Sequence, residues 1–264
     1  MAGVESSKTR QVYLVLRDRI AGGRLDNTES LPAEQALAVE YGVSRVTVRR
    51  ALAELELEGL ISRRRGAGTF VRGGVAKPIV ADFSDVMANL VAMGRDTAVR
   101  LLAFSYREPP AAIAEALRLP PGAKTQFSVR VRLIDDKPFS HLTTFVPEQI
   151  GVTYTEADLA ARPLLSLLER SGVQIERATQ QVTAVLASPE VAAALEVDVG
   201  SALLGTTRTV FAADGSGVEH LIALYRPDRY ALQMDMVRTE AAGVRRWATV
   251  LASEPNDTIS RKAS

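Results

Sequence analysis

The chain has 264 residues, 47% of them hydrophobic and 24% charged, which is enough for two domains that each bury a core. The absence of cysteine excludes disulfides, thiolate metal sites and cysteine nucleophiles, and only two histidines, His141 and His220, argue against a histidine-rich metal site. Since no apolar run approaches a membrane span and the N-terminus lacks a signal-peptide core, we expect a cytoplasmic protein without metal or cofactor.

The net charge of +1 is divided unevenly along the chain. Residues 1–73 contain 12 Lys and Arg against 9 Asp and Glu, whereas the remainder contains 20 against 22. A basic excess is what neutralisation of nucleic-acid phosphates requires. The first quarter of the chain is therefore the expected DNA-binding part.

Three helices are predicted in this first part. An apolar stripe predicts a helix over residues 9–20. A second helix is expected from residue 31, with Pro32 in its first turn and Tyr41-Gly42 closing it. A third begins after Ser44, whose side chain can cap a helix start. The order of helix, glycine turn and helix is that of a helix-turn-helix.

The third helix has two distinct faces. Apolar residues recur at the spacing of one buried face, while basic residues and a hydroxyl project from the first two turns of the other. Arginine side chains can pair with guanine edges or with phosphates in a major groove, so a recognition helix is predicted. An ordinary amphipathic helix with a solvated basic face is the alternative.

Two short β-type runs follow around a basic, glycine-rich turn, which is typical of the wing of a winged helix-turn-helix. The wing arginines can reach phosphates or the minor groove. The residues expected to contact DNA are Ser44, Arg45, Thr47, Arg49, Arg50, Arg63, Arg64, Arg65, Gly66, Gly68 and Thr69.

Residues 9–72 resemble the DNA-binding domain of the GntR family of bacterial transcription regulators. The resemblance departs from the family pattern at Gln35 and Ala67, where the family usually has basic residues. It is carried by Leu31-Pro32-x-Glu34, Tyr41-Gly42-Val43-Ser44-Arg45-x-Thr47-Val48-Arg49, Glu58-Gly59-Leu60-Ile61 and Gly66-x-Gly68-Thr69-Phe70-Val71.

After an expected linker at residues 74–80, the pattern becomes one of strands alternating with short helices. This arrangement predicts an α+β domain around a mainly antiparallel sheet. Hairpin turns are expected at Asp135-Asp136-Lys137 and at Asp214-Gly215-Ser216-Gly217. Strands are predicted at 97–106, 126–134, 138–145, 173–187, 203–212, 218–225 and 230–237, and helices at 84–93, 110–117, 155–168 with an interruption at Pro163, and 189–195.

This second part resembles the UTRA effector-sensing domain of the HutC branch of the GntR family, whose fold is like that of chorismate lyase. The resemblance assigns residues 9–73 to DNA binding and 81–238 to effector binding and dimerisation. Residues 239–264 extend beyond the family pattern as a tail, for which a short helix followed by disorder is expected. The segments that carry it are Arg130-Val131-Arg132-Leu133-Ile134-Asp135-Asp136-Lys137-Pro138, Ala193-Ala194-Leu195-Glu196-Val197, Arg208-x-Val210, Val218-Glu219 and Tyr225-Arg226-Pro227-Asp228-Arg229-Tyr230.

Arg130 and Arg132 stand two apart on a predicted strand, so their side chains point to one face and can clamp a carboxylate or phosphate. The alternative is that they pair with acids on the outer face of the sheet. For Glu219 and Tyr225, a surface acid and a core tyrosine are the alternative. The UTRA resemblance implies ligand contacts at Phe83, Ser84, Arg130, Arg132, Ser166, Glu219 and Tyr225, although Ser166 can equally cap a helix turn.

The chain is therefore expected to be a ligand-responsive DNA-binding regulator located at the bacterial nucleoid. The simplest form is a homodimeric repressor that a small anionic metabolite releases from a roughly palindromic operator. Two alternatives are an architectural DNA-binding dimer and a lyase-like enzyme. The enzyme is disfavoured because the sequence shows no nucleophile with a base, no phosphate loop and no metal cluster. Gly66-x-Gly68 also lacks the third glycine of a dinucleotide-binding motif.

Overall fold

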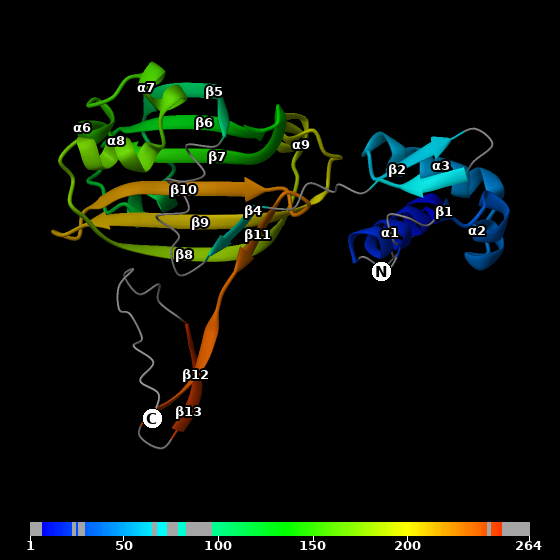
Figure 1. Ribbon diagram of the computed structural model, residues 1–264. Coiled ribbons are helices and arrows are strands. Elements are labelled where there is room, and N and C mark those ends of the chain that lie inside the picture. Colours follow the sequence, from blue (N-terminus) through cyan, green and yellow to red (C-terminus); the bar gives the residue numbers. More distant parts are fainter. Residues whose placement is uncertain are drawn as a thin grey trace, which may run out of the picture. The chain divides into compact units, whose positions relative to one another are not determined.

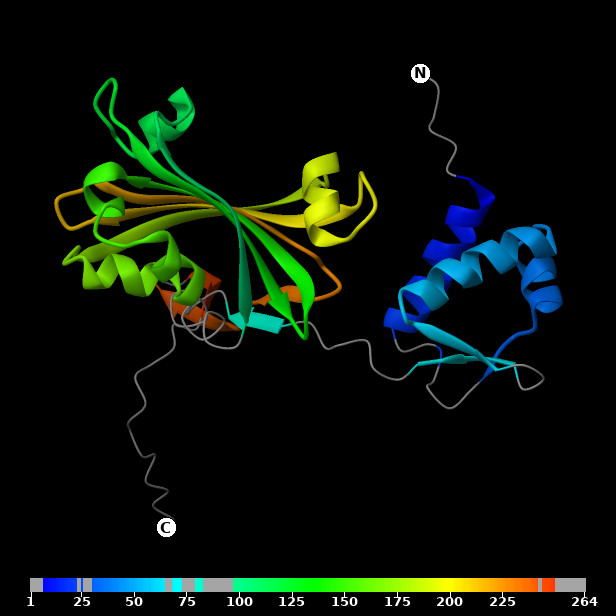
Figure 2. The ribbon, with the colours of Figure 1, turned by 90° about the horizontal axis from the view of Figure 1, so that it is seen from above.

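The computed structural model describes residues 7–22, 25, 30–64, 68–72, 79–82, 97–241 and 244–249. The chain forms two compact units, Met1–Lys77 and Pro78–Ser264 (Figures 1 and 2). Each unit has its own buried apolar core. No helix within the described ranges is long and apolar enough to cross a bilayer.

The first unit is a winged helix-turn-helix, as expected. Gly42, with φ of +61°, makes the turn between its second and third helices in a conformation that favours glycine. The helix expected from residue 31 begins only at Glu34, after Pro32. The elements of the first unit are α1 (Lys8–Ala21), β1 (Ser30–Leu31), α2 (Glu34–Glu40), α3 (Arg45–Leu57), β2 (Ile61–Arg64) and β3 (Gly68–Val71). Its strands lie in the order β1-β3-β2.

The core of this unit joins all three helices to the wing. Leu16 of α1, Leu37 of α2 and Leu52 of α3 are each at most 1% exposed. Burying a leucine side chain contributes about 1.5–3 kcal/mol, so these contacts hold α3 firmly against the other helices. Ile61 and Val71 extend the same core into the two wing strands.

The second unit is built on a six-stranded antiparallel sheet in the order β5-β6-β7-β10-β9-β8. Asp135 and Asp136 both have positive φ, as a two-residue β6–β7 hairpin turn requires. Its strands are β5 (Ala98–Arg107), β6 (Thr125–Ile134), β7 (Lys137–Pro147), β8 (Ile175–Leu186), β9 (Ala202–Ala212) and β10 (Gly217–Tyr225).

Short helices cover both faces of this sheet. On one face, α5 (Ala111–Ala116) and α9 (Pro189–Leu195) pack at opposite ends. On the other, α7 (Glu156–Ala161) and α8 (Leu164–Arg170) share a core with Val146 and Val210, after α6 (Glu148–Gly151). The interruption expected at Pro163 separates α7 from α8. The fold class predicted above is confirmed.

Three segments differ from the predicted elements. Residues 79–80, expected in the linker, belong to β4 (Ile79–Asp82), which pairs in parallel with β11 (Tyr230–Gln233). The strand expected over 230–237 ends at Gln233. Up to residue 249 the expected tail helix is wrong, because β12 (Met236–Ala241) and β13 (Val244–Thr249) form an antiparallel hairpin. The helix predicted at 84–93 lies outside the described residues.

We expect Gly217→Ala to destabilise the second unit by about 1–3 kcal/mol, the usual cost of overpacking. A Cβ at Gly217 would lie 2.4 Å from the carbonyl oxygen of Leu117 and 2.5 Å from its Cα, so backbone would have to move. Thermal unfolding of the full chain measures the effect. Ala213→Ser, which adds an atom at an exposed position nearby, should stay within about 0.5 kcal/mol. Equal melting temperatures for both variants would contradict the close packing of Gly217 against the backbone of Leu117.

Candidate functional site

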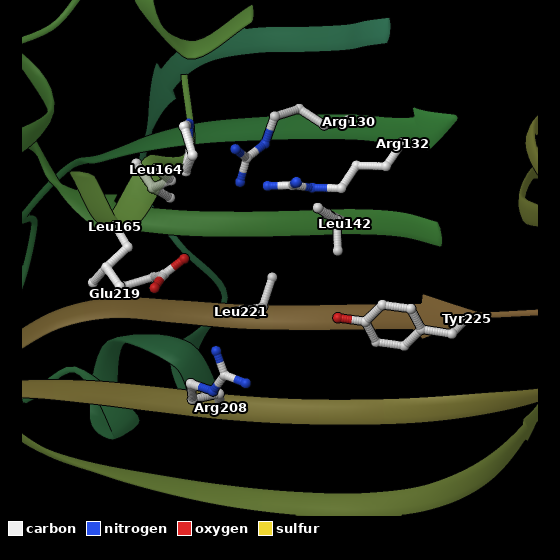
Figure 3. A pocket seen from close by; sticks show the side chains of 10 residues that line it. Arg130, Arg132, Leu142, Leu164, Leu165, Arg208, Glu219, Leu221 and Tyr225 are labelled. Atoms are coloured by element: carbon white, nitrogen blue, oxygen red, sulfur yellow. The ribbon is translucent and has the colours of Figure 1, made fainter. Parts of the chain in front are cut away.

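A pocket opens on the α8 face of the six-stranded sheet (Figure 3). Side chains of one face of neighbouring strands form its floor, because alternate residues of a strand point to the same side. It contains about 510 Å³ of space not filled by protein atoms, part of it open to solvent. Its lining residues are Arg130, Arg132, Leu142, Pro163, Leu164, Leu165, Arg208, Glu219, Leu221 and Tyr225.

Three arginines and one carboxylate are buried around this pocket. Arg130, Arg132 and Arg208 are 2%, 7% and 4% exposed, and Glu219 is 7% exposed. Among the described residues, no ion pair within 4.0 Å joins any of the three guanidiniums to an acid. Within the described ranges, the alternative of Arg130 and Arg132 pairing with acids on an outer face therefore has no support, because both line the pocket. Because a buried charge is costly unless it is compensated, this cluster is suited to an external anion.

The arginines are held to different degrees. Nη1 of Arg132 donates to Oγ1 of Thr97 at 3.1 Å. Nε and Nη2 of Arg208 both donate to Oε1 of Gln180, the Nε bond being 2.8 Å long. Nε of Arg130 has no hydrogen-bond partner within the described part of the chain. Arg130 is thus the least satisfied of the three.

The protonation of these groups reflects burial and mutual repulsion. Burial, and then the charge of Arg132, lower the pKa of Arg130 to about 10, and burial also lowers the pKa of Arg132. Burial raises the pKa of Glu219, although the charges of Arg208 and Arg130 oppose that rise. An anion placed between Arg130 and Arg132 would relieve their repulsion.

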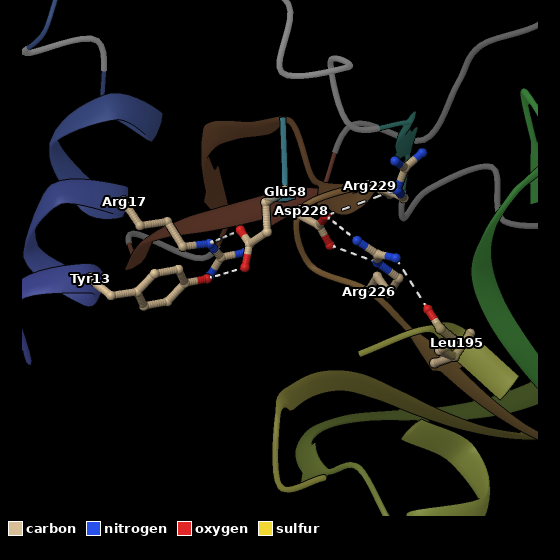
Figure 4. A network of polar contacts seen from close by, with 7 residues as sticks. All are labelled: Tyr13, Arg17, Glu58, Leu195, Arg226, Asp228 and Arg229. Atoms are coloured by element: carbon tan, nitrogen blue, oxygen red, sulfur yellow. Dashed lines mark hydrogen bonds and ion pairs between the residues drawn. The ribbon is translucent and has the colours of Figure 1, made fainter. Parts of the chain in front are cut away.

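An aromatic pair closes one end of the pocket. The ring of Tyr225 stacks on that of Tyr230 in β11, with centroids 4.0 Å apart and an interplanar angle of 16°. The turn between them is fixed by Arg226, which donates to both carboxylate oxygens of Asp228, at 3.1 and 2.8 Å, and to the carbonyl of Leu195 at 3.1 Å (Figure 4). The position of Tyr225 is therefore well defined.

The pocket brings together Arg130, Arg132, Glu219 and Tyr225 of the residues predicted to bind a ligand. Ser166 lies half-buried on α8 beside Leu165, but it does not line the pocket as described. Phe83 and Ser84 lie outside the described residues. Sequence reasoning missed Arg208 as a lining residue, although a single arginine within the strand Ala202–Ala212 was a signal that could have found it.

The two histidines lie away from the pocket. His141 follows Ser140 and precedes the lining residue Leu142, so it points to the opposite face of the sheet. His220 lies on that face too, where its Nδ1 is 3.0 Å from Oγ1 of Thr209. Burial lowers the pKa of both histidines. In the described part of the chain, no cluster of three potential metal ligands is present.

In the first unit, α3 presents the basic face expected of a recognition helix. Ser44 caps the helix, since its Oγ accepts a hydrogen bond from the backbone N–H of Thr47 at 3.2 Å. Val48, Leu52 and Leu55 form the buried side. At the far end of α3, Glu58 accepts a hydrogen bond from the hydroxyl of Tyr13 and lies 3.6 Å from Nε of Arg17 (Figure 4).

The basic residues of this unit divide into two groups. Arg49 pairs with Glu34 of α2 at 3.1 Å, and Nη2 of Arg63 donates to the carbonyl of Arg49 at 3.0 Å. These two arginines tie α2, α3 and the wing together. Arg45 and Arg50 are exposed, and neither makes a hydrogen bond or ion pair to another described residue.

The wing contributes fewer described residues. The guanidinium of Arg64 lies over the ring of Phe70, 5.5 Å from its centroid. Gly68 and Thr69 begin β3, opposite Arg64 and Arg63. Arg65 and Gly66 lie outside the described residues.

Comparisons with known proteins agree with this arrangement. Residues 8–71 match the family model described as bacterial regulatory proteins, gntR family, and residues 92–231 match the UTRA domain. The HTH-type transcriptional regulator Rv0792c of Mycobacterium tuberculosis is 32% identical over 241 residues, which cover 87% of this chain and 86% of that protein. The chain belongs to the GntR family. The HTH-type transcriptional repressor NagR of Bacillus subtilis is 27% identical over 220 residues, 83% of this chain and 90% of NagR.

The solved structure of PhnF from Mycobacterium smegmatis shares the fold of this GntR-family chain. Its TM-score is 0.51 at 23% identity, over 84% of this chain and 97% of PhnF. The pairing of a GntR domain with a UTRA domain is consistent with the HutC subfamily. The chain is thus a transcription regulator with an effector-binding domain, and its domains and homologues are not those of an enzyme.

Proposed function

We propose that this GntR-family regulator is a homodimeric repressor that a small anionic metabolite releases from operator DNA. The observation that carries the proposal is the pocket of three buried arginines and one carboxylate, in which no described acid pairs with an arginine. We assign DNA binding to residues 9–73 and effector binding and dimerisation to residues 81–238. Since the partner is DNA, the proposed place of action is the cytoplasm, at the nucleoid.

The pocket favours an effector with two different ends. Arg130 and Arg132 can hold a phosphate or carboxylate through charge-assisted hydrogen bonds. The carboxylate of Glu219 forms no ion pair with another described residue. It is placed to accept hydrogen bonds from hydroxyl or ammonium groups of the same molecule. Sugar phosphates combine these features, and so do some acidic catabolites.

Dimerisation follows from the way a single recognition helix reads DNA. One helix contacts only a few base pairs, and two helices related by a twofold axis reach successive major grooves and lengthen the site. We propose that Arg45, Thr47 and Arg50 contact DNA from α3, with Arg64 and Thr69 from the wing. Several phosphate contacts per dimer make the affinity strongly dependent on salt.

Thermal unfolding of the full chain with a panel of phosphorylated sugars, sugar acids and acidic catabolites tests the effector class. A ligand at about 100 times its dissociation constant adds about 2.7 kcal/mol, which raises the melting temperature by several degrees. We expect such a rise with a sugar phosphate and none with its unphosphorylated parent. If no anion raises the melting temperature or weakens operator binding, the proposal fails in favour of an architectural DNA-binding dimer.

A further inference from the structure

We propose that Arg208, held in place by Gln180, keeps the carboxylate of Glu219 ionised while an anionic effector occupies the pocket. Arg208 is thus a positioning residue, because it acts on the effector through Glu219. This inference rests on the proposed function of the same pocket.

The register of the sheet puts Arg208 beside Glu219. On β9 and β10, Arg208 lies opposite Leu221, and Val210 lies opposite Glu219. Arg208 and Glu219 are therefore diagonal neighbours on the same face, within reach of long side chains. Figure 3 shows both side chains at the pocket, on the opposite side from Arg130 and Arg132.

Gln180 fixes the other flank of Arg208. It lies opposite Arg208 in the register of β8 and β9. Its Oε1 accepts hydrogen bonds from both Nε and Nη2 of the guanidinium. Because a side-chain amide is neutral, this contact orients Arg208 without cancelling its charge, which remains available to act on Glu219.

Few described charges face Glu219. Arg130 reaches it from β6 and Arg208 from β9, while Tyr225 of its own strand and Tyr154, before α7, are the other titratable groups nearby. Helix α8 contributes only the apolar Leu164 and Leu165 to this region of the pocket. The charges of Arg130 and Arg208 both lower the pKa of Glu219 against the effect of burial.

Effector binding changes the effect of Arg130 on Glu219 but leaves that of Arg208. An anionic group held by Arg130 and Arg132 offsets the positive potential that Arg130 exerts on Glu219. Arg208 then remains as the cation that stabilises the carboxylate. Without it, a proton would bind Glu219, and the neutral acid would accept weaker hydrogen bonds from a hydroxyl or ammonium group.

A ligand-free measurement tests the effect of the Arg208 charge on Glu219. Glu219 has a raised pKa in the folded state, so its contribution to stability is largest at low pH and declines as pH rises through that pKa. Arg208→Gln should raise the pKa further and extend the decline. We expect the loss of melting temperature caused by Arg208→Gln to be about 3 °C larger at about pH 8 than at about pH 5.

Glu219→Gln provides the matched background. In that background, the effect of Arg208→Gln should be the same at both pH values, since the titrating group is gone. Titration of His141 and His220 is common to all four proteins and cancels from the comparison. An equal effect of Arg208→Gln at both pH values with Glu219 present would overturn the proposal.

Gln180→Leu and a direct titration decide the question if Arg208→Gln does not fold. Gln180 is half-buried on an edge strand, so its replacement should fold and should raise the pKa of Glu219 in the same direction. Carboxyl ¹³C NMR of the full chain, with Glu219→Gln assigning the signal, reads this pKa. An unchanged pKa in Gln180→Leu would reject the role of Gln180 and Arg208. Because no effector is present, failure here is distinct from failure of the panel above.

Discussion

Arg130→Met should abolish the response to the effector and leave the protein at least as stable as the wild type. The loss of affinity should be about 30-fold or more, since losing a buried charged partner costs about 2–5 kcal/mol. The melting temperature without effector should stay unchanged or rise, because Arg130 is buried and its Nε has no partner among the described residues.

This combination distinguishes a binding residue from a structural one. Thermal unfolding with and without the active sugar phosphate measures both effects in one experiment. Arg162→Met, an exposed arginine immediately before Pro163, is the matched control and should keep the full response. If Arg130→Met lowers stability and retains the thermal shift, Arg130 serves the fold and the effector binds elsewhere.

Arg45→Ala and Arg50→Ala should each weaken operator binding by about 10- to 100-fold for each subunit of a dimer, at about 1–3 kcal/mol for a base contact. Both side chains are exposed on the basic face of α3 and are not paired with other described residues. Fluorescence anisotropy at several salt concentrations measures the affinity. A residue that contacts phosphate should lower the salt slope by about one per contact, whereas a residue that reads a base should relax specificity.

Arg49→Ala separates DNA contact from support. Because Arg49 already pairs with Glu34, its loss should cost less than about 1 kcal/mol of stability, as for other exposed ion pairs. Arg19→Ala, which breaks an exposed ion pair of α1 with Glu40, is the matched control and should leave operator affinity within about threefold. Should Arg45→Ala and Arg50→Ala behave like Arg19→Ala, α3 would not be the recognition helix.

The features that could be predicted from the sequence are those with local causes. Ser44 caps α3 through a residue only three positions away, and Asp135 and Asp136 make a turn between consecutive strands. Arg130 and Arg132 share a face because they lie two apart on one strand. Each of these follows from spacing within a few residues, so the winged helix, the first hairpin and the arginine pair were accessible from the sequence.

The features that were missed depend on distant parts of the chain. Arg208 of β9 shares a pocket with Arg130 of β6 because β10, the hairpin partner of β9, also pairs with β7, a strand distant in sequence. The sequence predicts a short helix beyond residue 238, where the structure has the hairpin of β12 and β13, because strands of only six residues are too short for periodicity to separate helix from strand. Strand order and short elements are set by tertiary pairing.

The parallel pair of β4 and β11 has a mechanical consequence. Tyr230 is opposite Ile79 in this pair, and its ring lies flat against Tyr225 at the pocket wall. Ile79 is also the first described residue after the segment that joins the two units. A bound molecule that tilts Tyr225 must therefore either separate the two rings or pull on the strand where the chain enters the sensing unit. One stacked pair of rings and one strand pair thus link the pocket wall to the first described residues of the second unit.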